Sequence, residues 1–498
     1  MPEARITIDP AFQIGEVDPR LFGSFVEHLG RCVYTGIYEP DHPTADKSGF
    51  RGDVAALVAE LDTPIIRYPG GNFVSGYRWE DGVGSRDQRP QRLDLAWKSL
   101  ESNQVGTDDF CGWARGVGSE PMLAVNLGTR GVEAAASLVE YCNHPFGTYW
   151  SDLRRRNGAA DPHGVRVWCL GNEMDGPWQI GHKTADEYGR LATEAAKAMR
   201  LVDPSIELVA CGSSGPQMST FGDWEATVLQ HCYDQVDYVS VHSYYEERDG
   251  DRGSFLACAT QMDRFIEAVV STVDFVRAKG RYPKRVDLSF DEWNVWYHSR
   301  EPERDRWDRA PRLLENSYSV VDAVVVGNLM ISLLRHADRV RIGCIAQLVN
   351  VIAPILTEPG GPAWRQTSFY PFALTSRHGR GTALRIVQDG PSYETADFGR
   401  VPVVDAAAVA GGGGEVTIFA VNRDQHSTVP LDVDLRGYPA LRVAGHTSLG
   451  GTDPEATNTL SAQQRVVPRG HDPIAVSDGH LRTELPPLSW NMLRVRAS

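Results

Sequence analysis

Eight short apolar segments, alternating with longer amphipathic ones, constrain the fold of this chain more than any other feature of its sequence. The apolar segments are residues 21–26, 64–67, 122–126, 165–170, 207–210, 238–242, 287–290 and 342–347. Parallel strands that are covered on both faces have short, continuous apolar runs, and the amphipathic stretches between them are typical of connecting helices. Eight such units predict an α/β fold, a closed (β/α)8 TIM barrel.

The connecting segments carry helix signals. Residues 184–202 begin at Thr184, a residue type that caps helix N-termini, and stop before Asp203 and Pro204. Further helices are expected near residues 53–61, 108–117, 132–142 and 314–336. The barrel predicted in this way occupies residues 18–371, which exceeds the ~250 residues of a typical barrel, so we expect insertions in its loops.

After about residue 371 the pattern changes to Thr- and Val-rich segments separated by Gly and Pro turns. This pattern predicts a C-terminal all-β sandwich, jelly-roll-like, over residues 372–498. Residues 4–8 alternate in the same way, and we expect residues 1–17 to add a strand to that sandwich. Four glycines at 411–414 have no strand-to-helix context and no following Lys-Ser/Thr, which favours a hairpin tip over a phosphate-binding loop.

The 498-residue chain has a formal net charge of −15, which argues against nucleic acid as a partner, because such binding depends on Lys and Arg that neutralise phosphates. The first residues show no secretory signal pattern, and no apolar stretch is long enough to span a membrane. The eight cysteines form no CxxC pair, and several lie in apolar runs. We therefore expect a cytoplasmic protein with buried, reduced thiols.

Polar and charged side chains follow the predicted strands where apolar packing alone would not place them. In a parallel barrel the reactive groups lie just past the carboxyl ends of the strands, so these side chains are expected to share one mouth. They are Glu27, His28, Arg67, Asn72, Asn126, Asn172, Glu173, His242, Tyr244, Asp291, Glu292 and Gln347.

Two of these residues are glutamates, Glu173 and Glu292. Hydrolysis of a glycosidic bond needs such a pair: one carboxyl protonates the departing oxygen, and the other meets the positive charge that develops at the anomeric carbon. An isolated Glu is ordinarily a solvated surface group. Here both follow apolar strands directly, beside Asn172 and Trp293, which favours a catalytic site.

The other mouth residues suit a sugar. Guanidinium and amide groups are well placed to bind vicinal hydroxyls, although each one alone is equally consistent with a structural hydrogen bond. His242 has no HExxH motif or cysteine cluster beside it, so a residue that tunes a carboxylate is favoured over a metal ligand, and we expect no metal and no cofactor. Nearby aromatic side chains either stack on sugar rings or simply pack under the loops; they are Trp97, Trp178, Trp293, Trp296, Tyr244 and Tyr297.

Four blocks of sequence, residues 25–32, 67–73, 168–173 and 291–296, closely resemble those of the α-L-arabinofuranosidases of glycoside hydrolase family 51. The blocks read FVEHLGRC, RYPGGNF, WCLGNE and DEWNVW, and the resemblance covers nearly the whole chain. It implies that Glu173 is the acid/base and Glu292 the nucleophile. It also implies that seven residues line the subsite of the terminal furanose and that Trp97 and Trp296 lie on the leaving-group side; the seven are Glu27, Arg67, Asn72, Asn172, His242, Tyr244 and Gln347.

The resemblance implies a retaining, exo-acting α-L-arabinofuranosidase that acts on arabino-oligosaccharides, arabinan or arabinoxylan fragments through a covalent glycosyl-enzyme. It also implies an intracellular homo-oligomer, a hexamer. Two alternatives are an endoglucanase of the same fold and a carbohydrate-binding protein without activity. The Arg- and Glu-rich loop at residues 298–311 is interpreted as a lid, an oligomer contact or a solvated surface.

Overall fold

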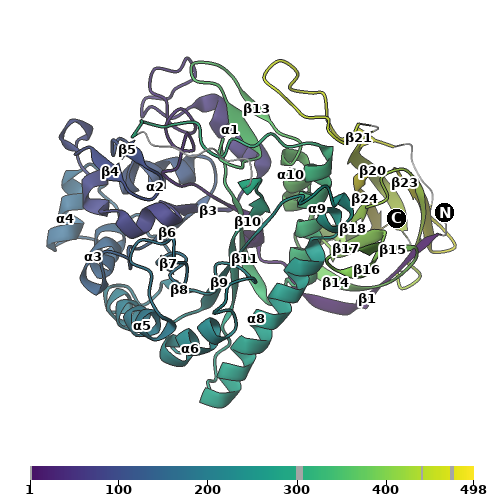
Figure 1. Ribbon diagram of the computed structural model, residues 1–498, viewed down its shortest axis with the longest axis horizontal. Helices are drawn as coiled ribbons and strands as arrows, with labels where there is room; N and C mark the ends of the chain where they lie inside the picture. The colour runs from purple at the N-terminus through teal and green to yellow at the C-terminus, as the bar shows by residue number, and fades with distance from the viewer. Residues whose placement is uncertain (1–2, 299–306, 439–440, 452, 472–475, 498) are drawn as a thin grey trace.

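A closed barrel of eight parallel strands forms the larger part of the molecule (Figure 1). The computed structural model describes residues 3–298, 307–438, 441–451, 453–471 and 476–497. Around the barrel the strands follow the order β10-β11-β2-β3-β6-β7-β8-β9. Their bounds are β2 Gly23–Phe25, β3 Ile65–Tyr68, β6 Glu120–Ala124, β7 Val167–Leu170, β8 Glu207–Cys211, β9 Tyr238–Tyr245, β10 Asp287–Val295 and β11 Val340–Ala346. The predicted TIM barrel is confirmed, and each of its strands overlaps one of the eight apolar segments.

Helices cover the outside of the barrel. They are α1 Gly52–Leu61, α2 Thr107–Gly116, α3 Val132–Asn143, α4 Tyr149–Arg156, α5 Ala185–Val202, α6 Asp223–Cys232, α7 Arg252–Leu256, α8 Ala259–Gly280, α9 Val320–Arg335 and α10 Phe369–His378. Helix α5 begins where the sequence predicts, because the Thr184 side chain accepts a hydrogen bond from the Glu187 amide. Helix α9 begins at Val320 rather than near residue 314, because Leu314 has a left-handed backbone with a φ of 54° and Ser319 provides the cap.

A ten-stranded sheet contains both ends of the chain and packs against the barrel through α9 (Figure 1). Its strands are β1 Ala4–Glu16, β14 Thr382–Asp389, β17 Val404–Ala410, β18 Glu415–Asn422, β19 Val429–Asp434, β20 Leu441–Gly450, β21 Arg469–Gly470, β22 Val476–Ser477, β23 His480–Leu485 and β24 Ser489–Ala497. The order is β21-β20-β24-β18-β17-β14-β1-β19-β23-β22, and β20 contacts β22 from the opposite end. The sheet therefore curls around a core of its own, which includes Ile6, Ile418 and Leu431. The predicted C-terminal all-β domain is confirmed.

The first strand, β1, pairs antiparallel with β14 and parallel with β19. Residues 411–414 connect β17 to the antiparallel β18, as expected for a hairpin tip. Gly413 and Gly414 have φ values of 69° and 76° there, a conformation that glycine adopts without steric cost.

Three short hairpins extend from these two bodies. They are β4–β5 (Arg92–Asp94 and Ser99–Glu101), β12–β13 (Ile355–Thr357 and Ala363–Arg365) and β15–β16 (Ser392–Thr395 and Gly399–Pro402). Short 3-10 helices occur at Pro19–Phe22, Asn72–Gly76, Trp79–Gly82, Arg86–Gln88 and Gly412–Gly414. The first two hairpins are insertions of the kind that the length of the barrel segment predicts.

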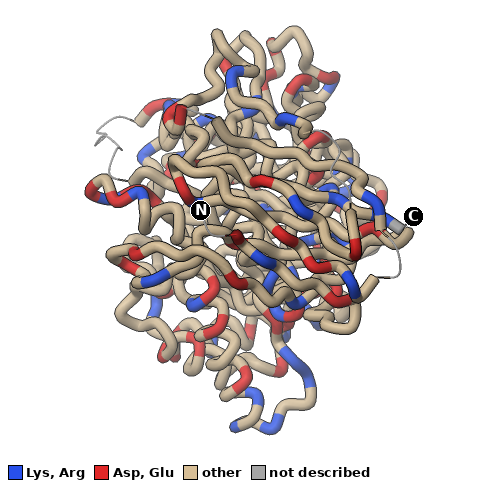
Figure 2. Tube along the Cα trace, turned by 90° about the vertical axis from the view of Figure 1, so that its right-hand side faces the viewer, with Lys and Arg blue, Asp and Glu red and all other residues tan. Residues whose placement is uncertain are grey.

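All eight cysteines are buried and unpaired, as predicted. Within the described ranges, no helix has the length and apolar character needed to cross a bilayer. Acidic and basic residues are interspersed over the face shown in Figure 2. Residues 299–306 of the loop at 298–311 lie outside the described residues, so the interpretations of that loop stay predictions.

Candidate active site

The carboxyl ends of the barrel strands surround a cavity of about 990 Å³. Eight of the predicted site residues line it: Glu27, Asn72, Trp97, Glu173, Tyr244, Glu292, Trp296 and Gln347. The other three, Arg67, Asn172 and His242, are buried and hydrogen-bond to lining residues. The structure thus brings together all eleven residues that the family resemblance implies, although they come from segments spread over more than 300 positions of the chain. His28 and Asn126, which are also expected at this mouth, do not line the cavity: His28 hydrogen-bonds to Glu101 and Tyr68, and Asn126 donates to the Tyr77 carbonyl.

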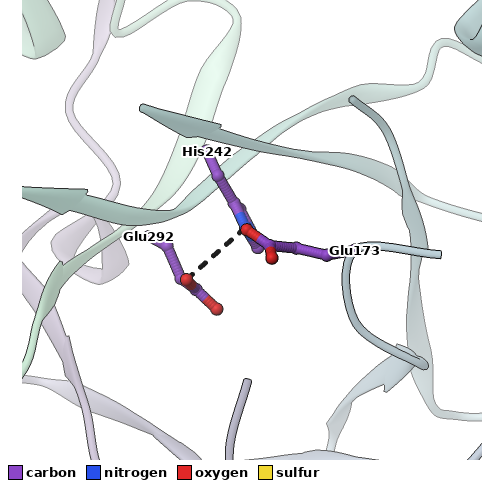
Figure 3. Close-up of side chains that lie close together, drawn as sticks. All are labelled: Glu173, His242 and Glu292. Carbon is purple, nitrogen blue, oxygen red and sulfur yellow. Dashed lines mark hydrogen bonds and ion pairs between the residues drawn. The ribbon is translucent and has the colours of Figure 1, made fainter. Parts of the chain in front are cut away.

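The two glutamates face each other across this mouth. Glu173 lies in the loop after β7, and Glu292 lies on β10. One carboxylate oxygen from each, together with a ring nitrogen of His242, lie within 4.8 Å of one another. Figure 3 shows the three side chains converging on one point. Glu173 has a left-handed backbone with a φ of 44°, a strained conformation for a non-glycine residue that is concentrated at functional sites.

Hydrogen bonds hold both oxygens of Glu292. The buried Arg67 guanidinium donates to Oε1 at 2.6 Å, and the Tyr244 hydroxyl donates to Oε2 at 2.8 Å. The other end of the same guanidinium donates to Asn172 Oδ1 at 2.7 Å. Charge-assisted bonds of this kind stabilise an ionised carboxylate and fix its direction. The Glu292 carboxyl is therefore fixed by Arg67 and Tyr244 where it lines the cavity.

Glu173 lies in a different electrostatic environment. His242 Nδ1 lies 2.8 Å from its Oε1, and Trp178 Nε1 donates to its Oε2 at 2.8 Å. Burial and the charge of Glu292 raise the pKa of Glu173, whereas the bonds from His242 and Trp178 oppose the rise. Glu173 consequently retains a proton to higher pH than an ordinary glutamate, as a general acid requires.

His242 bridges Glu173 to a buried aspartate. Its Nε2 lies 2.9 Å from Asp291 Oδ1, an atom that also accepts a hydrogen bond from Ser240. Burial alone would lower the pKa of His242, but the charges of Glu292, Asp291 and Glu173 outweigh it and raise the pKa to about 10. In Asp291 the effect of burial is likewise outweighed, by Arg67 and His242, and its pKa is lowered. At neutral pH both ring nitrogens of His242 therefore carry a proton and donate to carboxyl groups.

A third carboxyl group, Glu27, lies on another wall of the cavity. It accepts hydrogen bonds from the Phe73 amide, from Trp97 Nε1 at 2.9 Å and from Gln347 Nε2 at 3.0 Å. Burial raises its pKa to about 8, because the opposing bonds do not fully compensate. A Cβ atom at Gly70 would lie 2.7 Å from Glu27 Cγ. Glycine at position 70 therefore makes room for this carboxyl.

Asp291 and Trp178 have roles in the site that sequence reasoning did not assign. Strict alternation along β10 would direct Asp291 away from the face that Glu292 occupies. The register between β10 and β9 shifts between Ser289 and Glu292, and such a bulge lets two successive side chains point inward. The acidic pair at 291 and 292 is the one signal in the sequence that could have indicated it.

Glu173, His242 and Glu292 also have the spacing needed to hold a metal ion. Their ligand atoms already take part in hydrogen bonds, and the Arg67 guanidinium lies 2.6 Å from Glu292. Two positive groups, Arg67 and the protonated His242, thus supply the charge that a cation would bring. The hydrogen-bond network accounts for the arrangement without an ion.

Comparison with known proteins adds independent information. Two family models match the chain, "Alpha-L-arabinofuranosidase 1 domain" over residues 57–265 and "Alpha-L-arabinofuranosidase C-terminal domain" over residues 291–489. A relative from Streptomyces lividans, named intracellular exo-alpha-(1->5)-L-arabinofuranosidase, is 58% identical over 99% of this chain and 75% of its own length. One from Bifidobacterium longum, named exo-alpha-(1->6)-L-arabinofuranosidase, is 52% identical over 100% of this chain and 98% of its own.

One solved structure has the same fold as this chain over nearly its whole length. The family 51 α-L-arabinofuranosidase AbfB from Bifidobacterium longum superposes with a TM-score of 0.96 at 48% identity, covering 99% of both chains. The agreement includes the barrel and the curled sheet together.

Proposed function

The chain belongs to the α-L-arabinofuranosidases of glycoside hydrolase family 51, and from this premise we propose that it removes terminal non-reducing α-L-arabinofuranosyl units with retention of anomeric configuration. The proposal rests chiefly on one distance: a carboxylate oxygen of Glu173 and a carboxylate oxygen of Glu292 lie within 4.8 Å of each other. Retaining glycosidases have carboxyl groups about 5–5.5 Å apart, whereas inverting ones leave about 6.5–9.5 Å for a water molecule.

In the first step Glu292 attacks the anomeric carbon, and the bond from that carbon to the departing oxygen breaks. Glu173 transfers its proton to the departing oxygen, which leaves as a hydroxyl group. Arg67 and Tyr244 direct the attacking carboxylate, since each donates to one of its oxygens. The products of this step are a free alcohol and an arabinofuranosyl ester of Glu292.

In the second step water cleaves the ester. Once Glu292 is esterified its negative charge is gone, and the interaction that helps to keep Glu173 protonated is lost. Glu173 then accepts a proton from the attacking water, and the released Glu292 carboxylate returns to Arg67. Two inversions at the same carbon give net retention.

Asn72, Asn172, Glu27 and Gln347 are proposed to bind the hydroxyls of the terminal furanose. Gln347 is 3% exposed, and its Oε1 has no hydrogen-bond partner in the described structure. Trp296 Nε1 likewise has no partner there. A buried polar atom without a partner costs free energy, so a sugar hydroxyl at either atom would recover a hydrogen bond on binding.

The alternatives differ in their products. An endo-acting glucanase would shorten glucans without releasing arabinose, whereas the relatives described above are named exo-acting arabinofuranosidases. A non-catalytic sugar-binding protein has no need for two opposed carboxyl groups, one fixed by Arg67 and Tyr244 and the other with a raised pKa. The name of the Streptomyces lividans relative also supports a cytoplasmic enzyme. The hexamer stays a prediction that sedimentation analysis tests.

Glu173→Ala provides the test of roles. Formation of the ester from 2,4-dinitrophenyl α-L-arabinofuranoside needs no proton, so it should persist, while hydrolysis of oligosaccharides falls by about 10²–10⁴-fold. Azide should restore turnover and give the arabinofuranosyl azide of retained configuration. If both substrates lost activity by the same factor, the assignment of Glu173 as the acid would be wrong.

A further inference from the structure

A second cavity, of about 450 Å³, opens beside the first at the end of β9. The two share part of their lining, so they are continuous; the shared residues are Gln217, Tyr244, Tyr245, Glu246 and Arg248. Its volume lies within the ~300–1,000 Å³ typical of small-ligand sites. The hydrogen bond from Tyr244 to Glu292 places the junction directly beside the proposed nucleophile.

The far wall of this cavity comes from the C-terminal part of the chain. Asp397 and Phe398, in the turn between β15 and β16, line it together with residues of α7 and α8. The hairpin is fixed in place by two bonds: the Tyr393 hydroxyl donates to the Gly253 carbonyl at 3.0 Å, and the Asp397 amide donates to Ser254 Oγ at 3.2 Å. The cavity is thus formed by a fixed contact between the β15–β16 hairpin and the barrel.

The lining combines an aromatic ring with polar groups that have spare hydrogen-bonding capacity. The Arg264 guanidinium carbon lies 5.9 Å from the centre of the Phe398 ring. Among the described residues, the side chains of Gln217, Gln261 and Arg264 have no hydrogen-bond or ion-pair partner. A ring for an apolar sugar face, with amides and a guanidinium for hydroxyls, is a combination that suits a carbohydrate.

The charges of the lining favour a neutral ligand. Three carboxylates, Glu246, Asp251 and Asp397, face the same space as two guanidinium groups, Arg248 and Arg264. Arg248 Nε lies 3.7 Å from Glu246 Oε1, which offsets one charge of each sign. An anionic ligand would meet more negative than positive charge here, so an uncharged sugar is the better match.

We propose that this second cavity binds a further pentose unit of the oligosaccharide, on the leaving-group side. The inference rests on the proposed function. In an exo-acting enzyme the terminal unit occupies the closed end of the mouth, where Arg67 and Asn172 are buried. The second cavity opens from the first beside Tyr244, away from that closed end, and therefore receives the departing part of the substrate. Its lining at Phe398 and Arg264 then favours oligosaccharides over disaccharides.

The test compares kcat/KM on α-1,5-linked arabino-oligosaccharides of two to five units with kcat/KM on 4-nitrophenyl α-L-arabinofuranoside. For the unmodified enzyme we expect kcat/KM to rise by about fivefold or more from the disaccharide to the longer substrates, a difference of about 1 kcal/mol. Phe398→Ala and Arg264→Ala should each remove most of this rise. Both should leave kcat/KM on the aryl substrate within about twofold, which also shows that they fold.

Phe275→Ala is the matched control. Phe275 is 57% exposed on α8, and Lys279 Nζ lies 5.9 Å from its ring, so the pair repeats the Phe398–Arg264 contact outside both cavities. This variant should keep the full dependence on chain length. A flat dependence in the unmodified enzyme, or an undiminished rise in Phe398→Ala, would overturn the proposal. Loss of the proposed function would instead appear as no activity of the unmodified enzyme on the aryl substrate.

Discussion

Replacement of Trp178 by Phe tests how the protein sets the acidity of Glu173. Trp178 Nε1 donates to Glu173 Oε2 at 2.8 Å, and this bond stabilises the ionised carboxyl. Phenylalanine keeps much of the ring but has no donor. Removal of a bond to the charged form raises the pKa, so Glu173 should hold its proton to higher pH in the variant.

The size of the shift follows from the strength and exposure of the bond. A hydrogen bond to a charged group contributes about 1.5–3 kcal/mol. Trp178 is 51% exposed, so water replaces part of the lost interaction, and we expect the low end of that range. Since about 1.4 kcal/mol corresponds to one pKa unit, the pKa of Glu173 should rise by about one unit.

The assay is the pH dependence of kcat/KM on an arabinobiose substrate, because its alkaline limb reports the acid of the free enzyme. In Trp178→Phe this limb should move up by about one pH unit. With 2,4-dinitrophenyl α-L-arabinofuranoside, whose leaving group needs no proton, it should stay in place. Trp150→Phe on α4, outside the lining of the cavity, should match the unmodified enzyme on both substrates. An unchanged or lowered limb in Trp178→Phe would refute the reasoning.

Three further predictions concern the buried groups of the site. Asp291→Asn leaves Arg67 and His242 without a fully buried counter-charge, so urea unfolding should show a loss of about 3–5 kcal/mol in the free energy of unfolding; no loss would contradict this. The pKa of His242 is raised to about 10, so the protonated ring stabilises the folded state fully below about pH 6.5, and this stabilisation is lost as the pH rises toward 10. The Tm of the unmodified enzyme should therefore fall between about pH 6.5 and 10, and the Tm of His242→Gln should fall less. Gly70→Ala should displace Glu27 and raise KM for the aryl substrate by about tenfold or more, an effect of about 1.4 kcal/mol, with an unchanged KM as the contrary result.

The barrel could be predicted because its strands are buried on both faces and therefore have uninterrupted apolar sequences. Helix α8, in contrast, is not among the helices that the sequence analysis names. Cys258 at its N-terminus makes no capping hydrogen bond, so the usual start signal is missing there. The predicted start of α9 is too early. Residues before Val320 continue the hydrophobic pattern of the helix, but the backbone of Leu314 is left-handed, so the helix cannot extend that far.

The site could be predicted from polar residues placed after apolar strands, and from the four blocks that resemble a known family. The contribution of Asp291 depends on a bulge in β10, and the acidic pair at 291 and 292 is the one trace of it in the sequence. The second cavity depends on Phe398 meeting Arg264 across the hairpin contact. Such contacts arise from tertiary packing between distant segments, so periodicity and motifs contain no information about them.

The central claim is that Glu292 forms a covalent bond with the sugar, and trapping that species is its most direct test. Glu173→Ala is mixed with 2,4-dinitrophenyl α-L-arabinofuranoside, quenched in acid, digested and analysed by tandem mass spectrometry. The account predicts that one peptide carries a single arabinofuranosyl unit and that fragmentation places it on Glu292. A sugar on any other residue, or the rapid release of inverted arabinose with no adduct, would contradict the account.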